Sequence, residues 1–281
     1  MKLLRYGARG HEQPGVLDSE GQIRSLAGII PDIDGALLAR LPSALAGIDV
    51  AALPVVADDV RIAEPVGRVG KFICIGLNYI DHANEAGMPV PTEPIIFMKA
   101  TSSIIGPNDD VLLPPTSVKS DWEVELGVVI GREARYVSKE AAMDHVAGLV
   151  LVNDLSEREY QLERGGQWDK GKGCDTFGPF GPWLVTLDEV ADIDNLDLWL
   201  DLNGQRVQTG NTDKLIFDVP TVVSYVSQFM SLQPGDIIST GTPPGVGMGM
   251  KPPLFLKDGD VMELGIAGLG RQRQQVKRWP G

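Results

Sequence analysis

Two glutamates, Glu123 and Glu125, stand two residues apart in the apolar run Asp121 to Ile130. In an extended strand alternate side chains share a face, so both carboxylates are expected to project side by side, with Val124 and Leu126 pointing the opposite way. Two buried carboxylates without a cation would repel each other and carry a large desolvation cost. The pattern therefore predicts a divalent metal ion beside this strand.

A third carboxylate, Asp154, follows directly after an apolar strand predicted over Val146 to Val152. Three hard oxygen ligands, with water or substrate completing the shell, are typical of Mg²⁺ or Mn²⁺ sites. The competing interpretation is that all three carboxylates lie on the surface, as most Asp and Glu side chains do. The apolar residues around them favour the metal site.

His82 and Glu85 stand three residues apart, in a stretch from Asn78 to Ala86 that reads as a short helix or turn. This spacing lets a carboxylate meet an imidazole on one helical face, and such a histidine is a good general base for activating water. The alternative is an ordinary surface pair. His11 and His145 have no comparable partner and are interpreted as structural.

Lys172 lies in a glycine-rich run whose spacing from Gly166 formally matches a phosphate-binding loop. Gly173 replaces the required Ser or Thr, and neither a preceding strand nor a following helix is predicted, so nucleotide binding is rejected. A lysine on such a loop could instead neutralise a substrate carboxylate or enolate. The later run Gly241 to Gly247 is no dinucleotide fingerprint, but it offers backbone amides and the Thr242 hydroxyl to an anion.

The composition narrows the class of protein further. The net charge is −13 and no Lys/Arg cluster is visible, which argues against a nucleic-acid surface. The 2 cysteines are too few for a disulfide framework, and no signal peptide or membrane-spanning run is recognisable, so a cytoplasmic location is expected. Cys174 has no His neighbour in sequence, so a role as nucleophile is not indicated. The sequence contains no Gly-x-Ser-x-Gly motif, which argues against a serine hydrolase.

The elements that must position these residues are mostly strands, without the alternation of strand and helix that parallel sheets require. Beyond the strands already named, the pattern predicts strands at Lys2 to Tyr6, Pro14 to Leu17, Gln22 to Ser25, Phe72 to Gly76, Ile95 to Lys99, Trp183 to Val185, Asp197 to Leu202, Asp236 to Thr240, Asp260 to Ile266 and Arg271 to Lys277. Helices are predicted at Gly35 to Leu41, Lys139 to Asp144, Leu155 to Arg164 and Val219 to Phe229, and a loop at Gly165 to Pro182. A small N-terminal domain is expected over residues 1–66, followed by a main domain over 67–281.

Taken together, the motifs resemble the fumarylacetoacetate hydrolase superfamily, most closely its smaller acylpyruvate hydrolase branch. The resemblance covers roughly residues 68–277 and rests on Gly76 to His82, Asp121 to Gly127, Asn153-Asp154 with Arg158 and Gln161, Lys172 to Pro179, and Gly241-Thr242-Pro243. It implies a mixed β fold with some α, in which a β-roll C-terminal domain follows a small α+β N-terminal domain. It also implies a homo-oligomer, either a dimer or a tetramer.

The resemblance assigns a role to each of these residues. Glu123, Glu125 and Asp154 would hold Mg²⁺ or Mn²⁺, and His82 with Glu85 would activate water. Lys172 would stabilise enolate charge, and the substrate would be held by Lys99, Arg158, Gln161, Gly241 and Thr242. Two departures matter: Ile75 stands where fumarylacetoacetate-cleaving enzymes have a fourth carboxylate, and Leu77 stands where some acylpyruvases have Arg. The first favours an acylpyruvate-like substrate.

Within the superfamily, Met1 to Gly7 and Gly165 to Pro182 resemble the branch that cleaves 2,4-diketo-3-deoxy-L-rhamnonate to pyruvate and L-lactate. Related possibilities are the fuconate analogue, another acylpyruvate and ureidoglycolate lyase activity. Oxaloacetate decarboxylation or keto-enol isomerisation would need the same metal but no water-activating pair. A non-catalytic sugar-acid binding protein is the alternative outside enzymes.

Overall fold

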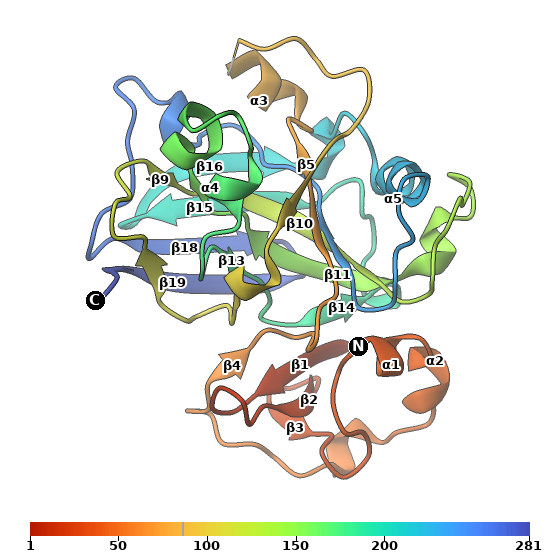
Figure 1. Cartoon of the computed structure of the whole chain (residues 1–281). Coiled ribbons are helices and arrows are strands. Elements are labelled where there is room, and N and C mark those ends of the chain that lie inside the picture. The colour runs from red at the N-terminus through yellow and green to blue at the C-terminus, as the bar shows by residue number, and fades with distance from the viewer. Residues whose placement is uncertain (86) are drawn as a thin grey trace.

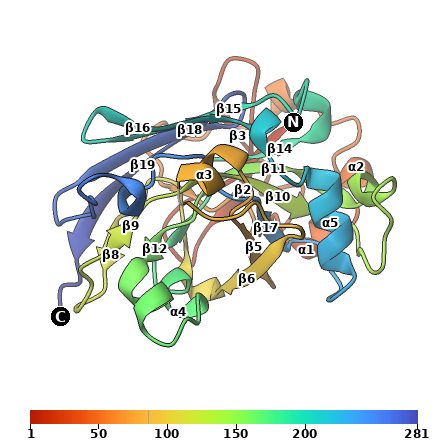
Figure 2. The ribbon, with the colours of Figure 1, turned by 90° about the horizontal axis from the view of Figure 1, so that it is seen from above.

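The computed structural model describes residues 1–85 and 87–281. Its largest sheet has ten strands, in the order β3 (Ile23–Ser25), β2 (Gln13–Leu17), β1 (Lys2–Tyr6), β14 (Leu184–Thr186), β11 (Val146–Asn153), β10 (Val124–Ile130), β17 (Ile237–Ser239), β5 (Phe72–Gly76) and β6 (Ile95–Lys99), with β4 (Ile62–Ala63) paired to β1. A second sheet of five strands runs β16 (Gln205–Asn211), β15 (Asp197–Leu202), β18 (Val261–Ile266), β19 (Gly270–Arg278) and β8 (Val111–Leu113). In Figures 1 and 2 the five-stranded sheet lies against strands β10 and β11 of the large sheet.

The remaining elements are short. Two-stranded pairings join β12 (Ser156–Glu157) to β9 (Ser120–Asp121), and β13 (Gly178–Pro179) to β7 (Ile104–Ile105). The α-helices are α1 (Gly35–Leu38), α2 (Leu41–Ala44), α3 (Ile80–Glu85), α4 (Asp169–Lys172) and α5 (Val219–Ser227). Single 3₁₀ turns cover Val50–Ala52, Thr101–Ser103, Ala142–His145, Leu187–Glu189, Thr212–Lys214 and Gly247–Gly249, and a π-helical turn covers Glu159–Glu163. None of the helices described is long and apolar enough to cross a membrane.

Strand β10 is buried along its whole length and lies between two apolar cores. Its alternate residues Val124, Leu126, Val128 and Ile130 all belong to the core that is shared with the five-stranded sheet. Val129 points the other way, into the core that is shared with the N-terminal segment. The alternation predicted for this strand is therefore confirmed, and it follows from the two-residue period of the side chains.

The N-terminal segment continues the large sheet, because β1 pairs antiparallel with β14 through Leu3 and Leu184. In Figure 1 the strands β1 to β4 and the helices α1 and α2 form a lobe below the remaining strands. Buried Leu3 packs in the same core as Phe72 of the main body. The division of the chain at residue 66 stays a prediction.

Several predicted strands have the observed bounds, including Phe72–Gly76, Ile95–Lys99 and Asp197–Leu202. The helix predicted over Lys139 to Asp144 is wrong, since only the 3₁₀ turn Ala142–His145 forms there. The amides of Gly131 and Arg132 both donate to the His145 carbonyl, and this long-range pairing leads the chain directly into β11.

The helix predicted over Leu155 to Arg164 is also wrong in part. The chain first forms β12, which pairs with β9, and only then the π-helical turn Glu159–Glu163. Conversely, the predicted loop Gly165 to Pro182 contains α4 and β13. Both β12 and β13 form by pairing with strands far away in the sequence, β9 and β7.

A carboxylate at the turn before β8 ties the N-terminal lobe to the main body. Arg61 Nε and Nη2 lie 2.8 and 2.6 Å from the two oxygens of Asp109, and Gly106 N donates to the same carboxylate at 2.8 Å. Burial opposes ionisation of Asp109, but the hydrogen bonds from Arg61 and Gly106 outweigh it and hold the pKa of this carboxyl below its usual value.

Substitution Asp109→Asn should lower the free energy of unfolding by roughly 1–3 kcal/mol at neutral pH, because a charged hydrogen-bond acceptor is lost from a mostly buried pair. With a lowered pKa, the folded protein stays ionised after the unfolded chain has taken up its proton. The contribution is therefore complete above about pH 4 and declines as the pH falls through the folded pKa. Urea unfolding at several pH values measures it, and the exposed pair Asp110–Lys277 supplies the control Asp110→Asn, for which little change is expected.

Candidate active site

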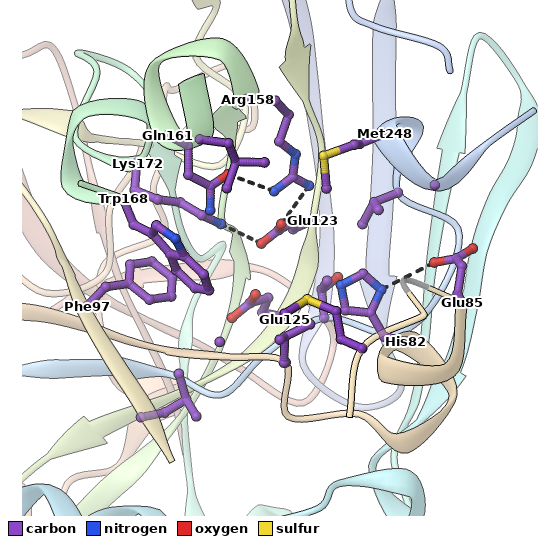
Figure 3. A pocket seen from close by; sticks show the side chains of 18 of the residues that line it. His82, Glu85, Phe97, Glu123, Glu125, Arg158, Gln161, Trp168, Lys172 and Met248 are labelled. Carbon is purple, nitrogen blue, oxygen red and sulfur yellow. Dashed lines mark hydrogen bonds and ion pairs between the residues drawn. The ribbon is translucent and has the colours of Figure 1, made fainter. Parts of the chain in front are cut away.

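A cavity of about 410 Å³ opens beside the ends of β10 and β5. Its walls come from α3, the π-helical turn, α4 and the loop after β17. Figure 3 shows Lys172 and Gln161 on one side of this cavity and His82 with Glu85 on the other. The charged and polar lining residues are His82, Glu85, Glu123, Glu125, Arg158, Gln161, Lys172, Thr242 and Lys251.

The three carboxylates predicted as metal ligands lie together. Glu123, Glu125 and Asp154 are buried, and one oxygen of each lies within 4.8 Å of the others. The antiparallel register of β10 and β11 places Val124 opposite Asn153, so Glu123 and Asp154 meet at the ends of neighbouring strands. Asp154 N donates to the Glu123 carbonyl at 2.9 Å and closes this corner.

Cations surround two of the three carboxylates. Lys172 Nζ donates to Glu123 Oε2 at 2.6 Å and to Asp154 Oδ2 at 2.7 Å. Lys99 Nζ donates to Asp154 Oδ1 at 2.6 Å, and Arg158 Nη2 lies 2.7 Å from Glu123 Oε1. Burial opposes ionisation of Glu123, but Lys172 and Arg158 outweigh it and lower the pKa of Glu123.

Glu125 is different, because among the described residues no cation contacts its carboxylate. Its Oε2 accepts hydrogen bonds from Ser239 Oγ at 2.6 Å and from Gly241 N at 2.8 Å. Burial raises the pKa of Glu125, and the charges of Asp154 and Glu123 raise it further. A divalent cation beside Glu125 would relieve both effects, so the donor set fits Mg²⁺ or Mn²⁺.

The predicted His–Glu pair forms at the cavity wall. His82 Nδ1 lies 3.2 Å from Glu85 Oε2, and the imidazole is mostly buried while it still lines the cavity. The Gly245 amide donates to the Glu85 carboxylate and lies 3.0 and 3.2 Å from its two oxygens. The pair can therefore present an oriented imidazole to a water molecule in the cavity.

Lys172 lies at the end of the short helix α4 and is 2% exposed. A Cβ at the neighbouring Gly171 would lie 2.3 Å from the Glu157 carbonyl oxygen, so only glycine allows α4 to approach β12 this closely. The Cys174 thiol nearby has a pKa raised to about 11, chiefly by burial. A thiol with a raised pKa is a poor nucleophile.

The residues predicted to hold substrate separate into two groups. Arg158, Gln161 and Thr242 line the cavity, whereas Lys99 and Gly241 lie behind the carboxylates and are not among its lining residues. Lys99 Nζ is occupied by Asp154 and by the Leu155 carbonyl at 2.9 Å, and the Gly241 amide is occupied by Glu125.

Thr242 has little free hydrogen-bonding capacity. Its hydroxyl donates to the Val124 carbonyl at 3.0 Å and accepts from Gln208 Nε2 at 2.8 Å. Three amides of the run predicted to receive an external anion, those of Gly241, Gly245 and Gly247, thus donate to the protein's own carboxylates, and the Thr242 hydroxyl is used within the protein as well.

Sequence reasoning missed the apolar wall and one buried carboxylate. The apolar lining residues are Ile75, Leu77, Met88, Phe97, Leu162, Trp168, Val246, Met248 and Met250, which come from distant segments with no common motif. The missed carboxylate is Asp121, which is fully buried and contacts Arg158. Its place in the run Asp-Trp-Glu-Val-Glu was the only available signal.

Comparisons with known proteins place this cavity in context. The family described as fumarylacetoacetate (FAA) hydrolase C-terminal matches residues 71–277. A protein of Burkholderia orbicola that is provisionally named as a hydrolase is 61% identical over 279 residues, which cover 99% of both chains.

Solved structures match over nearly the whole chain. A fumarylacetoacetate hydrolase from psychrophilic Exiguobacterium antarcticum has a TM-score of 0.89 and 35% identity, covering 99% of this chain and 100% of its own. A maleylpyruvate hydrolase from Sphingobium sp. SYK-6, solved in complex with manganese(II) and pyruvate, has a TM-score of 0.82 and 29% identity, covering 99% of each chain.

Proposed function

Because the chain belongs to the fumarylacetoacetate hydrolase family, we propose that it is a metal-dependent hydrolase that cleaves a carbon–carbon bond of a 2,4-diketo acid to pyruvate and a carboxylic acid. The observation that carries the proposal is a buried carboxylate triad whose members Glu123 and Glu125 line the same cavity as an oriented His–Glu pair, with Asp154 directly behind them. The triad accounts for a metal ion, and the pair accounts for activated water.

Glu123, Glu125 and Asp154 would hold Mg²⁺ or Mn²⁺. When bound, the ion supplies a Lewis acid that polarises the 1-carboxylate and 2-keto oxygens of the substrate. The related maleylpyruvate hydrolase was solved in complex with manganese(II) and pyruvate, which supports a divalent metal and a pyruvate product for this chain as well. Lys172, which contacts both Glu123 and Asp154, would lie beside the same end of the substrate.

His82 would take a proton from the water that attacks C4, while Glu85 keeps the imidazole oriented. The new C4–O bond forms a tetrahedral oxyanion. When it collapses, the C3–C4 bond breaks and its electron pair passes to C3, where it is delocalised as the enolate of pyruvate. The Lys172 ammonium stabilises this developing negative charge, and return of the proton from His82 to C3 completes pyruvate and restores the neutral imidazole. The C4 fragment leaves as the carboxylic acid.

The rest of the cavity lining favours a short substrate tail with mixed polarity. Met88, Leu162 and Met250 offer apolar contacts, while Gln161 Nε2 and Lys251 Nζ form no hydrogen bond with the rest of the described chain. The tail of 2,4-diketo-3-deoxy-L-rhamnonate carries one hydroxyl and one methyl group, which match these surroundings. We therefore propose this acid as the substrate, with L-lactate as the second product.

A panel of 2,4-diketo acids with different tails tests the proposal. The panel would contain the rhamnonate and fuconate derivatives, acetylpyruvate and longer acylpyruvates, with pyruvate and the second acid measured in each case. The highest kcat/KM is expected for the rhamnonate derivative. If no member released pyruvate, the proposal would be wrong, and turnover of oxaloacetate or ureidoglycolate in the same assay would point to those rival activities. Binding without turnover would indicate a sugar-acid binding protein.

Substitution Lys251→Met should raise KM for the best substrate by about tenfold or less and leave kcat nearly unchanged, as expected for a contact made equally in the ground and transition states. Steady-state kinetics measure both constants. Lys257→Met is the matched control, because Lys257 lies outside this cavity. A fall in kcat alone would contradict the assigned place of Lys251 at the substrate tail.

The homo-oligomer and the cytoplasmic location also remain proposals. Light scattering coupled to size-exclusion chromatography would distinguish a dimer or tetramer from a monomer of 30.3 kDa.

A further inference from the structure

Asp121 is a buried carboxylate that lies outside the metal triad and the His–Glu pair. It is 0% exposed, and both of its oxygens are occupied by donors. Its Oδ1 accepts from Gly247 N at 2.7 Å and from Trp122 N at 2.9 Å. Its Oδ2 accepts from Met248 N at 3.0 Å and from Arg158 Nε at 2.9 Å. A buried carboxylate whose two oxygens each accept two hydrogen bonds holds its donor groups in one arrangement.

Arg158 connects Asp121 to the metal triad. The guanidinium Nη2 lies 2.9 Å from Asp121 Oδ2 and 2.7 Å from Glu123 Oε1, so one group spans both carboxylates. Its Nη1 also donates to Gln161 Oε1 at 3.1 Å. Figure 3 shows the guanidinium between Gln161 and Glu123 at the cavity wall. The orientation of Glu123 therefore depends on where Asp121 holds the guanidinium.

The loop after β17 connects Asp121 to the other half of the site. The same loop that gives Asp121 the amides of Gly247 and Met248 also gives Glu85 the amide of Gly245. A Cβ at Gly247 would lie 2.0 Å from the Leu254 carbonyl oxygen and 2.9 Å from Asp121 Oδ1. The loop thus approaches Asp121 more closely than any residue but glycine would allow.

We propose that Asp121 is a positioning residue that holds Glu123, through Arg158, in the geometry for divalent metal binding. The inference rests on the proposed metal-dependent function and adds a residue to it. Asp121 also offsets the charge of Arg158, which would otherwise pair more strongly with Glu123 and compete with the metal for its oxygens. Outer carboxylates of this kind typically change metal affinity 10–100-fold when they are removed.

Binding of Mn²⁺ to the metal-depleted full-length protein tests the proposal, with free Mn²⁺ measured by electron paramagnetic resonance. Substitution Asp121→Asn should raise the dissociation constant for Mn²⁺ by about tenfold or more. In an Arg158→Met background the same substitution should have no further effect, because the residue acts through the guanidinium. This readout does not depend on turnover.

Asp236→Asn is the matched control. Asp236 is 1% exposed, and it accepts from Lys71 N at 2.8 Å and from Gln233 N at 2.7 Å while it pairs with the Lys71 ammonium at 2.5 Å. It is therefore a buried carboxylate with a similar set of donors, but it lies outside the lining of the cavity. Both variants should lose thermal stability, and only Asp121→Asn should lose Mn²⁺ affinity.

Arg158→Lys gives a second route if Asp121→Asn does not fold. It keeps the cation but cannot span Asp121 and Glu123, so it should also weaken Mn²⁺ binding. If the wild type binds Mn²⁺ and both variants bind it within twofold of the wild type, the positioning role is wrong while the proposed function stands. If the wild type binds no Mn²⁺, the metal-dependent function and the role of Asp121 are both contradicted.

Discussion

Substitution Glu125→Gln should lower kcat/KM for pyruvate release by at least about 10³-fold, because a metal ion contributes several kcal/mol to the transition state. Glutamine keeps the shape of the side chain but removes the anionic ligand. Glu125 is the carboxylate of the triad that no cation of the described chain contacts. Its charge is therefore the one that most requires the metal.

The same substitution should raise the thermal midpoint of the metal-free protein. Burial raises the pKa of Glu125, so the folded, metal-free protein retains a proton that the unfolded chain releases above about pH 4, the ordinary glutamate pKa. The free energy of unfolding of the metal-free wild type therefore falls as the pH rises above this value. The variant lacks this penalty. Calorimetry with and without Mn²⁺ measures the effect, and the exposed Glu133 supplies the control Glu133→Gln. A variant with full metal-dependent activity would contradict the assignment of Glu125.

Substitution His82→Ala should lower kcat by about 10²–10⁴-fold, the range typical for loss of a general base. The affinity for Mn²⁺ should change little, because His82 is not among the three ligands. Glu85→Gln should give a smaller loss, since it removes the group that orients the imidazole while the imidazole itself remains. Steady-state kinetics together with Mn²⁺ titration separate the two effects.

His145→Ala is the control for this experiment, because His145 lies outside the lining of the cavity. Undiminished hydrolysis of the diketo acid by His82→Ala would show that another group activates water. Loss of hydrolysis with retained decarboxylation of oxaloacetate would instead indicate that metal and Lys172 support enolate chemistry independently of the histidine.

The family resemblance and the mixed β fold could be predicted from the sequence, and both are confirmed. The prediction succeeded where the pattern was local. The two-residue period placed Glu123 and Glu125 on the face opposite Val124 and Leu126, and Asp154 followed a strand that was apolar throughout. Local periodicity is also the strongest secondary-structure signal in a single sequence.

The rest depended on partners far away in the sequence. Arg158 follows a strand that exists only because β12 pairs with β9, and no local pattern indicates that pairing. The amides of the run Gly241 to Gly247 appeared free for an anion, but the protein uses several of them for Glu125, Glu85 and Asp121. The partner of a backbone donor is determined by tertiary structure, and sequence spacing does not reveal it.

Pyruvate release from a 2,4-diketo acid by metal-depleted protein tests the central claim most directly. The metal-free protein should release no pyruvate above the uncatalysed rate, and added Mn²⁺ or Mg²⁺ should restore release with one equivalent of carboxylic acid for each pyruvate. Equal rates of release with and without metal, or pyruvate formed without the second acid, would contradict metal-dependent hydrolysis at this carboxylate triad.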